Sequence, residues 1–338
     1  MSAASGSTAT GTTGTVDRSG GVSASGVYVG RFAPSPTGRL HLGSLVAAVG
    51  SYLDARHAGG RWLVRMEDLD TPRVIPGCSD EMLRTLEAFG LHWDGEVEFQ
   101  SRRIGLYTES IKALQAAGLT FECSCTRRDL LNRLDTGYPG TRHDLLNRLD
   151  TGYPGTCRHG PTRPTRPTTT RFRVNGHQTV SWLDRVQGPC HIEMRELGDP
   201  VIRRRDGAFA YQLAVVVDDA AQGVSDVVRG ADLLQSTAWQ VQLQNALHLP
   251  TPRYGHLPLI MQSDGGEKLS KSRGSLAIDP TQAGAQLSEA LALLQHSPPA
   301  ELQHSYPTEL LAWAVANWHL DTFQGRREIV ASRPMSQV

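Results

Sequence analysis

The pattern of hydrophobic and polar positions predicts a strand–helix–strand unit in the N-terminal part of the chain. The short β-prone run 27–29 ends at Gly30 and leads into a loop rich in proline and glycine. Apolar residues then recur at helical spacing over 40–56, and 61–66 is again β-prone. Such a βαβ unit places the loop and the helix N-terminus at the carboxyl end of a parallel sheet, where anionic ligands bind.

The rest of the pattern extends this unit into a larger α/β fold. Regular pattern returns at 171–174, and the unbroken apolar run 210–217 is typical of a strand buried on both faces. Helical spacing predicts helices over 79–89, 103–117 and 233–247, and again beyond Asp279. The expected fold class is therefore α/β, with a doubly wound parallel sheet and a short helical C-terminal part.

Regular periodicity is lost between Phe121 and Thr170. Within this stretch the sequence DLLNRLDTGYPGT of 129–141 recurs unchanged at 144–156. We interpret the pair as a local duplication inside an insertion, because loops accept added length at a small entropic cost. The first 26 residues are mostly Ser, Thr, Gly and Ala and lack the features of a secretory signal. They predict a disordered leader.

Composition excludes several classes of protein. The 34 basic and 34 acidic residues balance, so any contact with RNA must come from local patches and not from an overall basic field. The run 203–205 is one such patch, although a solvated turn explains it equally well. Five cysteines are too few for a disulfide framework and indicate reduced thiols or metal ligands. No apolar run is long enough for a membrane span, and we expect a cytoplasmic protein.

Two motifs carry phosphate chemistry. His41 and Gly43 open the first helix, where an imidazole and a close backbone approach suit a nucleotide, although an ordinary capped helix start explains the triplet alone. Lys268 and Lys271 follow two glycines and can neutralise charge on a transferring phosphate, although a solvated basic loop is an equally good explanation. Each motif strengthens the other, because they stand in this order at the two ends of an α/β pattern.

At this point the sequence resembles the glutamyl branch of the class I aminoacyl-tRNA synthetases. HLGS at 41–44 is similar to their HIGH signature, and KLSKS at 268–272 is similar to KMSKS. RFAPSPTG at 31–38 and VRMEDLDTPR at 64–73 resemble the glutamyl branch specifically. The resemblance covers about 28–279 and implies a Rossmann-like catalytic domain that activates glutamate with ATP and Mg²⁺.

Chain length and cysteine spacing narrow the resemblance. About 60 residues follow Asp279, so we expect no anticodon-binding domain, and the insertion holds a Cys-x-Cys pair and a Tyr-x-x-x-Cys sequence. This combination resembles the glutamyl-queuosine tRNA(Asp) synthetases, which activate glutamate without tRNA and attach it to the wobble base queuosine of tRNA(Asp). The implied protein is a monomeric ligase with ATP, L-glutamate and this tRNA as partners. The alternatives are a truncated glutamyl-tRNA synthetase that charges a 3′ end, and a non-catalytic regulator that binds ATP or RNA.

The resemblance also implies roles for individual residues. Arginine matches carboxylates by bidentate hydrogen bonding, although a lone Arg or Glu is more often part of a surface ion pair. The implied glutamate-binding residues are Arg31 and Arg229 for the carboxylates, Glu67 for the ammonium, Tyr211 through its hydroxyl, and Ser35 in the same loop as Arg31. We expect His41 and Lys271 to stabilise the phosphate charge as the glutamate α-carboxylate attacks the α-phosphate, with Gly43 and Lys268 also at the nucleotide.

A structural zinc ion is implied within the insertion. The expected ligands are Cys123, Cys125, Tyr153 and Cys157, and the alternative is free buried cysteines. Tyr138, in the first copy of the duplication, stands at nearly the family's distance from Cys125, but Arg142 follows it where a cysteine is needed. We therefore choose Tyr153 and expect the extra copy to loop out. The two remaining cysteines, Cys78 and Cys190, are interpreted as structural.

The expected organisation has five parts. They are a leader (1–26), the first half of the catalytic domain (27–120), the zinc-bearing insertion (121–170), the second half of the catalytic domain with the KLSKS loop (171–280), and a helical C-terminal part (281–338).

Overall fold

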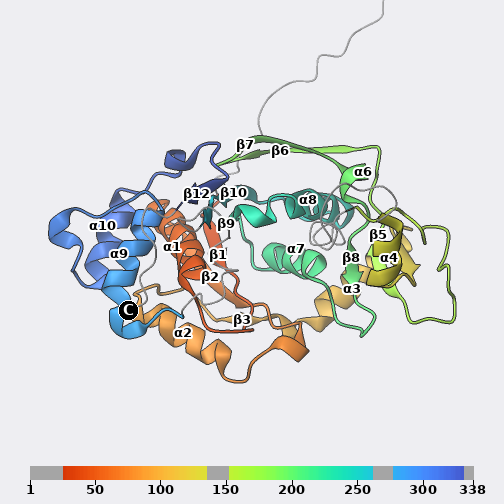
Figure 1. Ribbon diagram of the computed structural model, residues 1–338, viewed down its shortest axis with the longest axis horizontal. Helices are drawn as coiled ribbons and strands as arrows, with labels where there is room; N and C mark the ends of the chain where they lie inside the picture. Colours follow the sequence, from red (N-terminus) through yellow and green to blue (C-terminus); the bar gives the residue numbers. More distant parts are fainter. Residues whose placement is uncertain (1–25, 135–151, 262–276, 331–338) are drawn as a thin grey trace, which may run out of the picture.

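The computed structural model describes residues 26–134, 152–261 and 277–330 (Figure 1). Its centre is a set of parallel strands, in which β1 (Val29–Phe32) pairs with β2 (Arg61–Met66), and β2 pairs with β3 (Glu98–Phe99). The register places Val29 opposite Arg61 and Phe32 opposite Val64. The predicted βαβ unit is confirmed, because helix α1 (Leu42–His57) connects β1 to its parallel neighbour β2.

A second parallel pair continues the sheet beyond β1. Strand β9 (Asp226–Gly230) pairs with β10 (Arg253–Leu257), and the residue before β9 connects the two groups. The amide of Ser225 donates to the carbonyl of Val29 at 3.0 Å, and the amide of Val29 donates to the Ser225 hydroxyl at 2.9 Å. Strand β9 therefore lies beside β1 where both strands begin.

Helices cover both faces of these strands, so the fold is doubly wound, as predicted. In Figure 1, α1, α9 (Ala283–Leu293) and α10 (Pro307–Ala316) lie on one side, and α7 (Tyr211–Ala221) and α8 (Ser236–Ala246) lie on the other. The alternation along β2 produces this division. Trp62, Val64 and Met66 join the core under α1, with α2 (Cys78–Ala88) at its edge, whereas Leu63 belongs to a separate cluster with Val227 of β9.

Antiparallel elements interrupt the parallel arrangement after α3 (Ile104–Ala116). Strands β4 (Thr120–Cys123), β5 (Thr169–Phe172) and β8 (Val201–Arg203) form one sheet, next to α4 (Arg127–Leu134). Strands β6 (Thr179–Asp184) and β7 (Gly188–Glu193) form a long hairpin that is followed directly by α6 (Met194–Leu197). A small core of Phe121, Cys123, Leu130, Tyr153 and Cys157 joins β4 to α4 and to the segment that begins at residue 152.

The predicted strand at 210–217 is wrong, because these residues form most of helix α7. The apolar run is buried on all sides, in one core with α3 and α8, so it shows neither the period of a strand nor that of a helix. The structure differs from the prediction at two other places. Strand β1 begins at Val29, and the C-terminal part contains strand β12 (Glu328–Val330), which pairs in parallel with β11 (Leu259–Met261).

Several predictions fall wholly or partly outside the described residues. The leader and the centre of the duplicated segment lie there, as does the KLSKS sequence. Within the described ranges, no helix is long and apolar enough to cross a membrane.

Candidate active site

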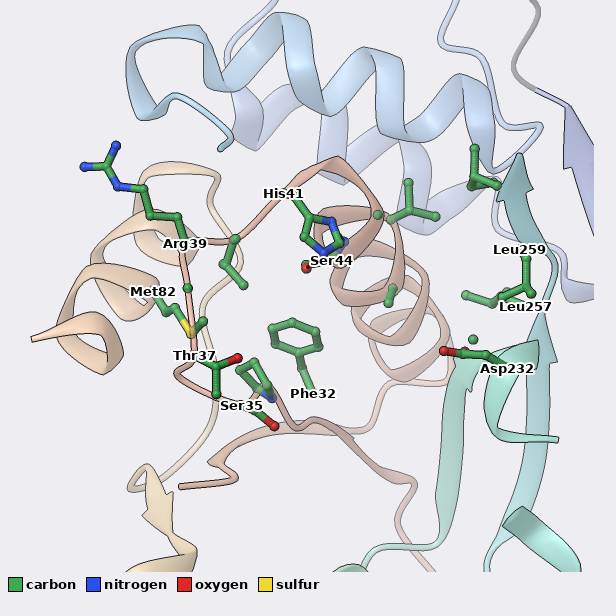
Figure 2. Close-up of a pocket in the computed structure, with 18 of the residues that line it drawn as sticks. Phe32, Ser35, Thr37, Arg39, His41, Ser44, Met82, Asp232, Leu257 and Leu259 are labelled. Atoms are coloured by element: carbon green, nitrogen blue, oxygen red, sulfur yellow. Dashed lines mark hydrogen bonds between the residues drawn. The ribbon is translucent and has the colours of Figure 1, made fainter. Parts of the chain in front are cut away.

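Two adjoining cavities open at the carboxyl ends of β1 and β9. The larger has a volume of about 520 Å³ and lies against the start of α1, with Ser35, Thr37, Arg39 and His41 among its lining residues (Figure 2). The smaller, of about 320 Å³, is lined by residues of β1, β9 and the first turn of α7. Both cavities are lined by Phe32, Ser35, Ala47 and Gly230, so they share a wall.

The larger cavity has the properties of an anion-binding site. His41 is the N-cap of the 16-residue helix α1, and its Nδ1 accepts a hydrogen bond from the amide of Ser44 at 3.1 Å. Gly43, in the first turn, also lines the cavity. The free amides and the dipole of the helix N-terminus favour a negatively charged group here. The predicted pair His41 and Gly43 therefore lies where a nucleotide phosphate can be bound.

The chain on either side of residues 262–276 borders this same cavity. Leu259 and Ile260 of β11 line it, and Ala277 forms an antiparallel bridge with His41. The amide of Ile278 donates to the carbonyl of Leu40 at 2.9 Å. Lys268 and Lys271 themselves lie outside the described residues, so their role remains a prediction.

All five residues implied for glutamate binding line the smaller cavity: Arg31, Ser35, Glu67, Tyr211 and Arg229. They come from β1, the loops after β1 and β2, the first residue of α7, and β9. The hydroxyl of Tyr211 accepts a hydrogen bond from Nη1 of Arg229 at 3.3 Å. Residues that are up to almost two hundred positions apart in the chain thus surround one space with two cations and one carboxyl group.

Asp219 of α7 holds the cationic side of the smaller cavity in place. Its carboxylate accepts hydrogen bonds from Nε and Nη2 of Arg31 at 3.1 and 3.3 Å, and from Nη2 of Arg65 at 2.8 Å. Burial raises the pKa of this carboxyl, but the two guanidinium groups outweigh burial and leave the pKa below its usual value. A buried ionised carboxylate between two arginines fixes the direction of both.

Glu67 has a different electrostatic environment. Its side chain is 9% exposed, and its only described ion pair is with Nη2 of Arg65 at 3.4 Å. Burial, only partly offset by Arg65 and Arg31, raises the pKa of Glu67 to about 7. A carboxyl group with this pKa gains its charge most readily when a cation enters the cavity.

Asp218 and His256 support this site and were missed by the sequence reasoning. Asp218 is fully buried and accepts hydrogen bonds from Arg103, Gln100 and Tyr107 at 2.6, 2.8 and 2.7 Å. The expected strand at 210–217 directed attention away from Asp218 and Asp219, which directly follow that run in helix α7 and both approach Arg65. His256 lies behind Arg229, and no motif in the sequence marks it.

The cysteines of the insertion form a compact cluster. The Sγ atoms of Cys123, Cys125 and Cys157 lie within 4.8 Å of one another, and Cys125 Sγ is 3.6 Å from Cys157 Sγ. The hydroxyl of Tyr153 lies 3.3 Å from Cys123 Sγ and accepts a hydrogen bond from the amide of Cys157 at 2.8 Å. Tetrahedral zinc with Zn–S bonds of about 2.3 Å separates its sulfur ligands by roughly 3.8 Å, so the three thiols are close enough together for such an ion, and the Tyr153 hydroxyl lies beside one of them.

The arginines at 203–205 each contact another part of the protein. Arg203 lies over the Phe209 ring at 5.6 Å, Arg204 pairs with Asp70 at 2.9 Å, and Arg205 donates to the carbonyl of Cys125 at 3.3 Å. These contacts connect β8 to the loop after β2 and to the cysteine cluster.

Comparison with known proteins defines the class of the fold and site. The family model for the catalytic domain of class I tRNA synthetases (E and Q) matches residues 27–295. The fold resembles the crystal structure of a glutamate tRNA ligase from Elizabethkingia meningosepticum in complex with its amino acid, with a TM-score of 0.69 and 23% sequence identity. That alignment covers 90% of this chain and 67% of the ligase chain. The fold is thus that of a class I tRNA synthetase catalytic domain.

Relatives with higher identity define the family. The chain is 53% identical over 292 residues to the Glutamyl-Q tRNA(Asp) synthetase of Ectopseudomonas mendocina, covering 86% of this chain and 93% of the relative. It is 51% identical over 292 residues to the protein of the same name from Pseudomonas aeruginosa, with the same coverage. The chain belongs to the glutamyl-Q tRNA(Asp) synthetase family of class I tRNA synthetases and is a ligase-type enzyme.

Proposed function

We propose that this enzyme activates L-glutamate with ATP in the absence of tRNA and transfers it to queuosine in tRNA(Asp). The observation that carries the proposal is the pair of cavities that share a wall, one at a helix N-terminus and one lined by two arginines and a carboxyl group. The membership of the family supports the choice of substrates. The nucleotide and the amino acid would meet at the shared wall.

The larger cavity suits ATP. Its volume of about 520 Å³ lies in the range of small-molecule sites. His41 and the amides of the first turn of α1 would bind phosphate oxygens, and Lys268 and Lys271 would add positive charge as pyrophosphate leaves. Mg²⁺ would arrive with ATP, and Asp232 supplies a carboxylate to the described lining of this cavity.

The smaller cavity suits glutamate. Arg31 and Arg229 would bind carboxylate, Glu67 would pair with the ammonium, and the hydroxyl of Tyr211 would add a hydrogen bond. Ser35, on the shared wall, would lie beside the amino-acid backbone.

The reaction would proceed in two steps. An oxygen of the α-carboxylate forms a bond to the α-phosphorus while the bond from that phosphorus to pyrophosphate breaks, which gives glutamyl-adenylate. A hydroxyl of the queuosine ring then attacks the acyl carbon, AMP leaves, and the hydroxyl proton is released. Positioning and electrostatic stabilisation carry the first step, so it needs no protein nucleophile.

The cysteine cluster would hold one structural zinc ion. Cys123, Cys125 and Cys157 would bind it as thiolates, with Tyr153 as the fourth ligand. The ion would join β4 to the segment around Cys157 and so fix the insertion against β8.

We further propose the five-part organisation predicted from the sequence, a monomeric state and a cytoplasmic location.

Glutamate-dependent exchange between ATP and labelled pyrophosphate, measured without tRNA, tests the activation step. We expect exchange with L-glutamate and none with L-glutamine. Exchange that required tRNA would refute tRNA-independent activation. Transfer is tested with labelled glutamate on tRNA(Asp) with queuosine, tRNA(Asp) without queuosine, and tRNA(Glu). Labelling of tRNA(Glu) in place of queuosine-bearing tRNA(Asp) would favour a synthetase that charges a 3′ end.

A further inference from the structure

Arg229 is held by a buried histidine that the reaction described above does not use. His256 lies in β10, next to β9, and is fully buried. Its Nε2 atom accepts a hydrogen bond from Nε of Arg229 at 3.0 Å. Nη2 of Arg229 donates to Thr237 and Gln240, each at 2.8 Å. These contacts fix the guanidinium plane and leave Nη1 on the side of Tyr211 and the smaller cavity.

Asp184 determines which nitrogen of His256 carries the proton. Its Oδ2 lies 2.5 Å from Nδ1 of His256, so Nδ1 must be the donor. Its Oδ1 accepts the backbone amides of Val186, Gln187 and His256 at 3.0, 2.9 and 3.0 Å. Every hydrogen bond to Asp184 is therefore donated by its partner, and this arrangement stabilises the ionised carboxylate.

The charge states agree with this arrangement. Burial lowers the pKa of His256 to about 4, although the bond to Asp184 opposes the effect. Burial raises the pKa of Asp184, but the hydrogen bonds from His256 outweigh it and leave the pKa at about 2. A neutral imidazole with its proton on Nδ1 has a lone pair on Nε2, and only this form can accept the hydrogen bond from Arg229.

We propose that Asp184 and His256 are positioning residues that set the orientation of Arg229 for the glutamate carboxylate. The pair selects one histidine tautomer, and this tautomer holds the guanidinium by its Nε. The inference rests on the proposed function, because it takes Arg229 to bind glutamate. Asp184 is the last residue of β6, so the inference adds the β6–β7 hairpin to the elements that determine affinity for the amino acid.

The substitution Asp184→Asn tests the tautomer directly. The three backbone amides keep the Asn oxygen at the Oδ1 position, so the Asn amide group must face Nδ1 of His256. A donor at that position moves the ring proton to Nε2, where it opposes the Nε–H of Arg229. We expect the KM for glutamate in pyrophosphate exchange to rise at least tenfold, with the KM for ATP unchanged within twofold.

Two further variants separate positioning from general structural support. His256→Leu removes the acceptor and should raise the KM for glutamate to a similar extent. His256→Gln restores an oxygen near the Nε2 position and should recover most of the affinity. The matched control is Asp199→Asn. Asp199 is equally buried and accepts hydrogen bonds from a backbone amide and from an arginine side chain, but it does not line the cavity.

The decisive measurements are the two KM values and the ring ¹⁵N spectrum of His256. A wild-type spectrum with the proton on Nε2 would overturn the inference, and this holds even if the variants fail to fold. The inference would also be overturned if the Asp184→Asn and His256→Leu proteins fold and their KM for glutamate stays within twofold of the wild-type value. The same holds if their KM values for glutamate and for ATP rise equally. If the wild type shows no glutamate-dependent exchange, the proposed function has failed, and the spectrum still tests the pair itself.

Discussion

The proposed pairing of Glu67 with the substrate ammonium predicts that glutamate binding depends on pH. Its pKa of about 7 follows from burial in the smaller cavity, where Arg65 and Arg31 favour the charged form and Asp219 and Asp218 oppose it. In the proposed complex, the ammonium of glutamate pairs with the ionised form of Glu67. Because the pKa is raised, this form is present above pH 7 and is lost as the pH falls. Affinity for glutamate should therefore increase as the pH rises.

The size of the effect follows from the pKa. With a value of about 7, roughly one Glu67 side chain in eleven is ionised at pH 6 and about ten in eleven at pH 8. We expect the KM for glutamate to fall about tenfold between these two pH values, while the KM for ATP changes much less. The substrate itself contributes little, because neither of its carboxyl groups nor its ammonium titrates in this range.

The assay is glutamate-dependent pyrophosphate exchange at pH 6, 7 and 8. Glu67→Gln removes the titrating group and a charged hydrogen bond that contributes about 2 kcal/mol, so its KM should be roughly 30-fold higher at pH 8 and independent of pH. Glu96→Gln, at an exposed position, is the control and should behave as the wild type. A wild-type KM that varies less than twofold across the range would refute a neutral Glu67 in the empty cavity.

Three further predictions concern the architecture around the site. Cys157→Ser should remove bound zinc in metal analysis of the purified protein, whereas Cys190→Ser should retain it; equal zinc content in both would refute the ligand set. Asp219→Asn leaves two buried guanidinium groups without their shared carboxylate and should lower the free energy of unfolding by about 3–5 kcal/mol in chemical denaturation; a loss below 1 kcal/mol would contradict this. Gly60→Ala places a methyl group against the carbonyl of Tyr28 and should lower Tm by several degrees, whereas Gly176→Ala, with open space around it, should not; equal Tm values would show that β1 and β2 can shift freely.

The local sequence pattern predicts the first half of the catalytic domain well. Helix α1 and strand β2 agree closely with their predicted ranges. The apolar residues of α1 recur at helical spacing, and β2, although buried on both faces, is a short β-prone run. Helix α7 could not be predicted in this way. Its residues are buried all round, and valine-rich runs of this length fit either element, so contacts with α3 and α8 decide the structure.

In the candidate site, too, local motifs predict some residues, whereas contacts between distant parts of the chain decide others. Motifs mark Arg31, His41 and Glu67, and the structure brings each to the wall of a cavity. Asp184 and His256 belong to no motif that we could recognise, because their chemistry depends on a contact between residues 72 positions apart. A single sequence carries no record of such a contact.

The wall that the two cavities share consists, apart from Phe32, of the small residues Ser35, Ala47 and Gly230. A stable mimic of the mixed anhydride, with a glutamate head joined to adenosine through a sulfamoyl bridge, would have its linker at this wall. Its two halves would then combine the affinities of separate sites without a second loss of translational freedom. Substituents on the bridge would press against these shared residues, so larger linkers should weaken binding.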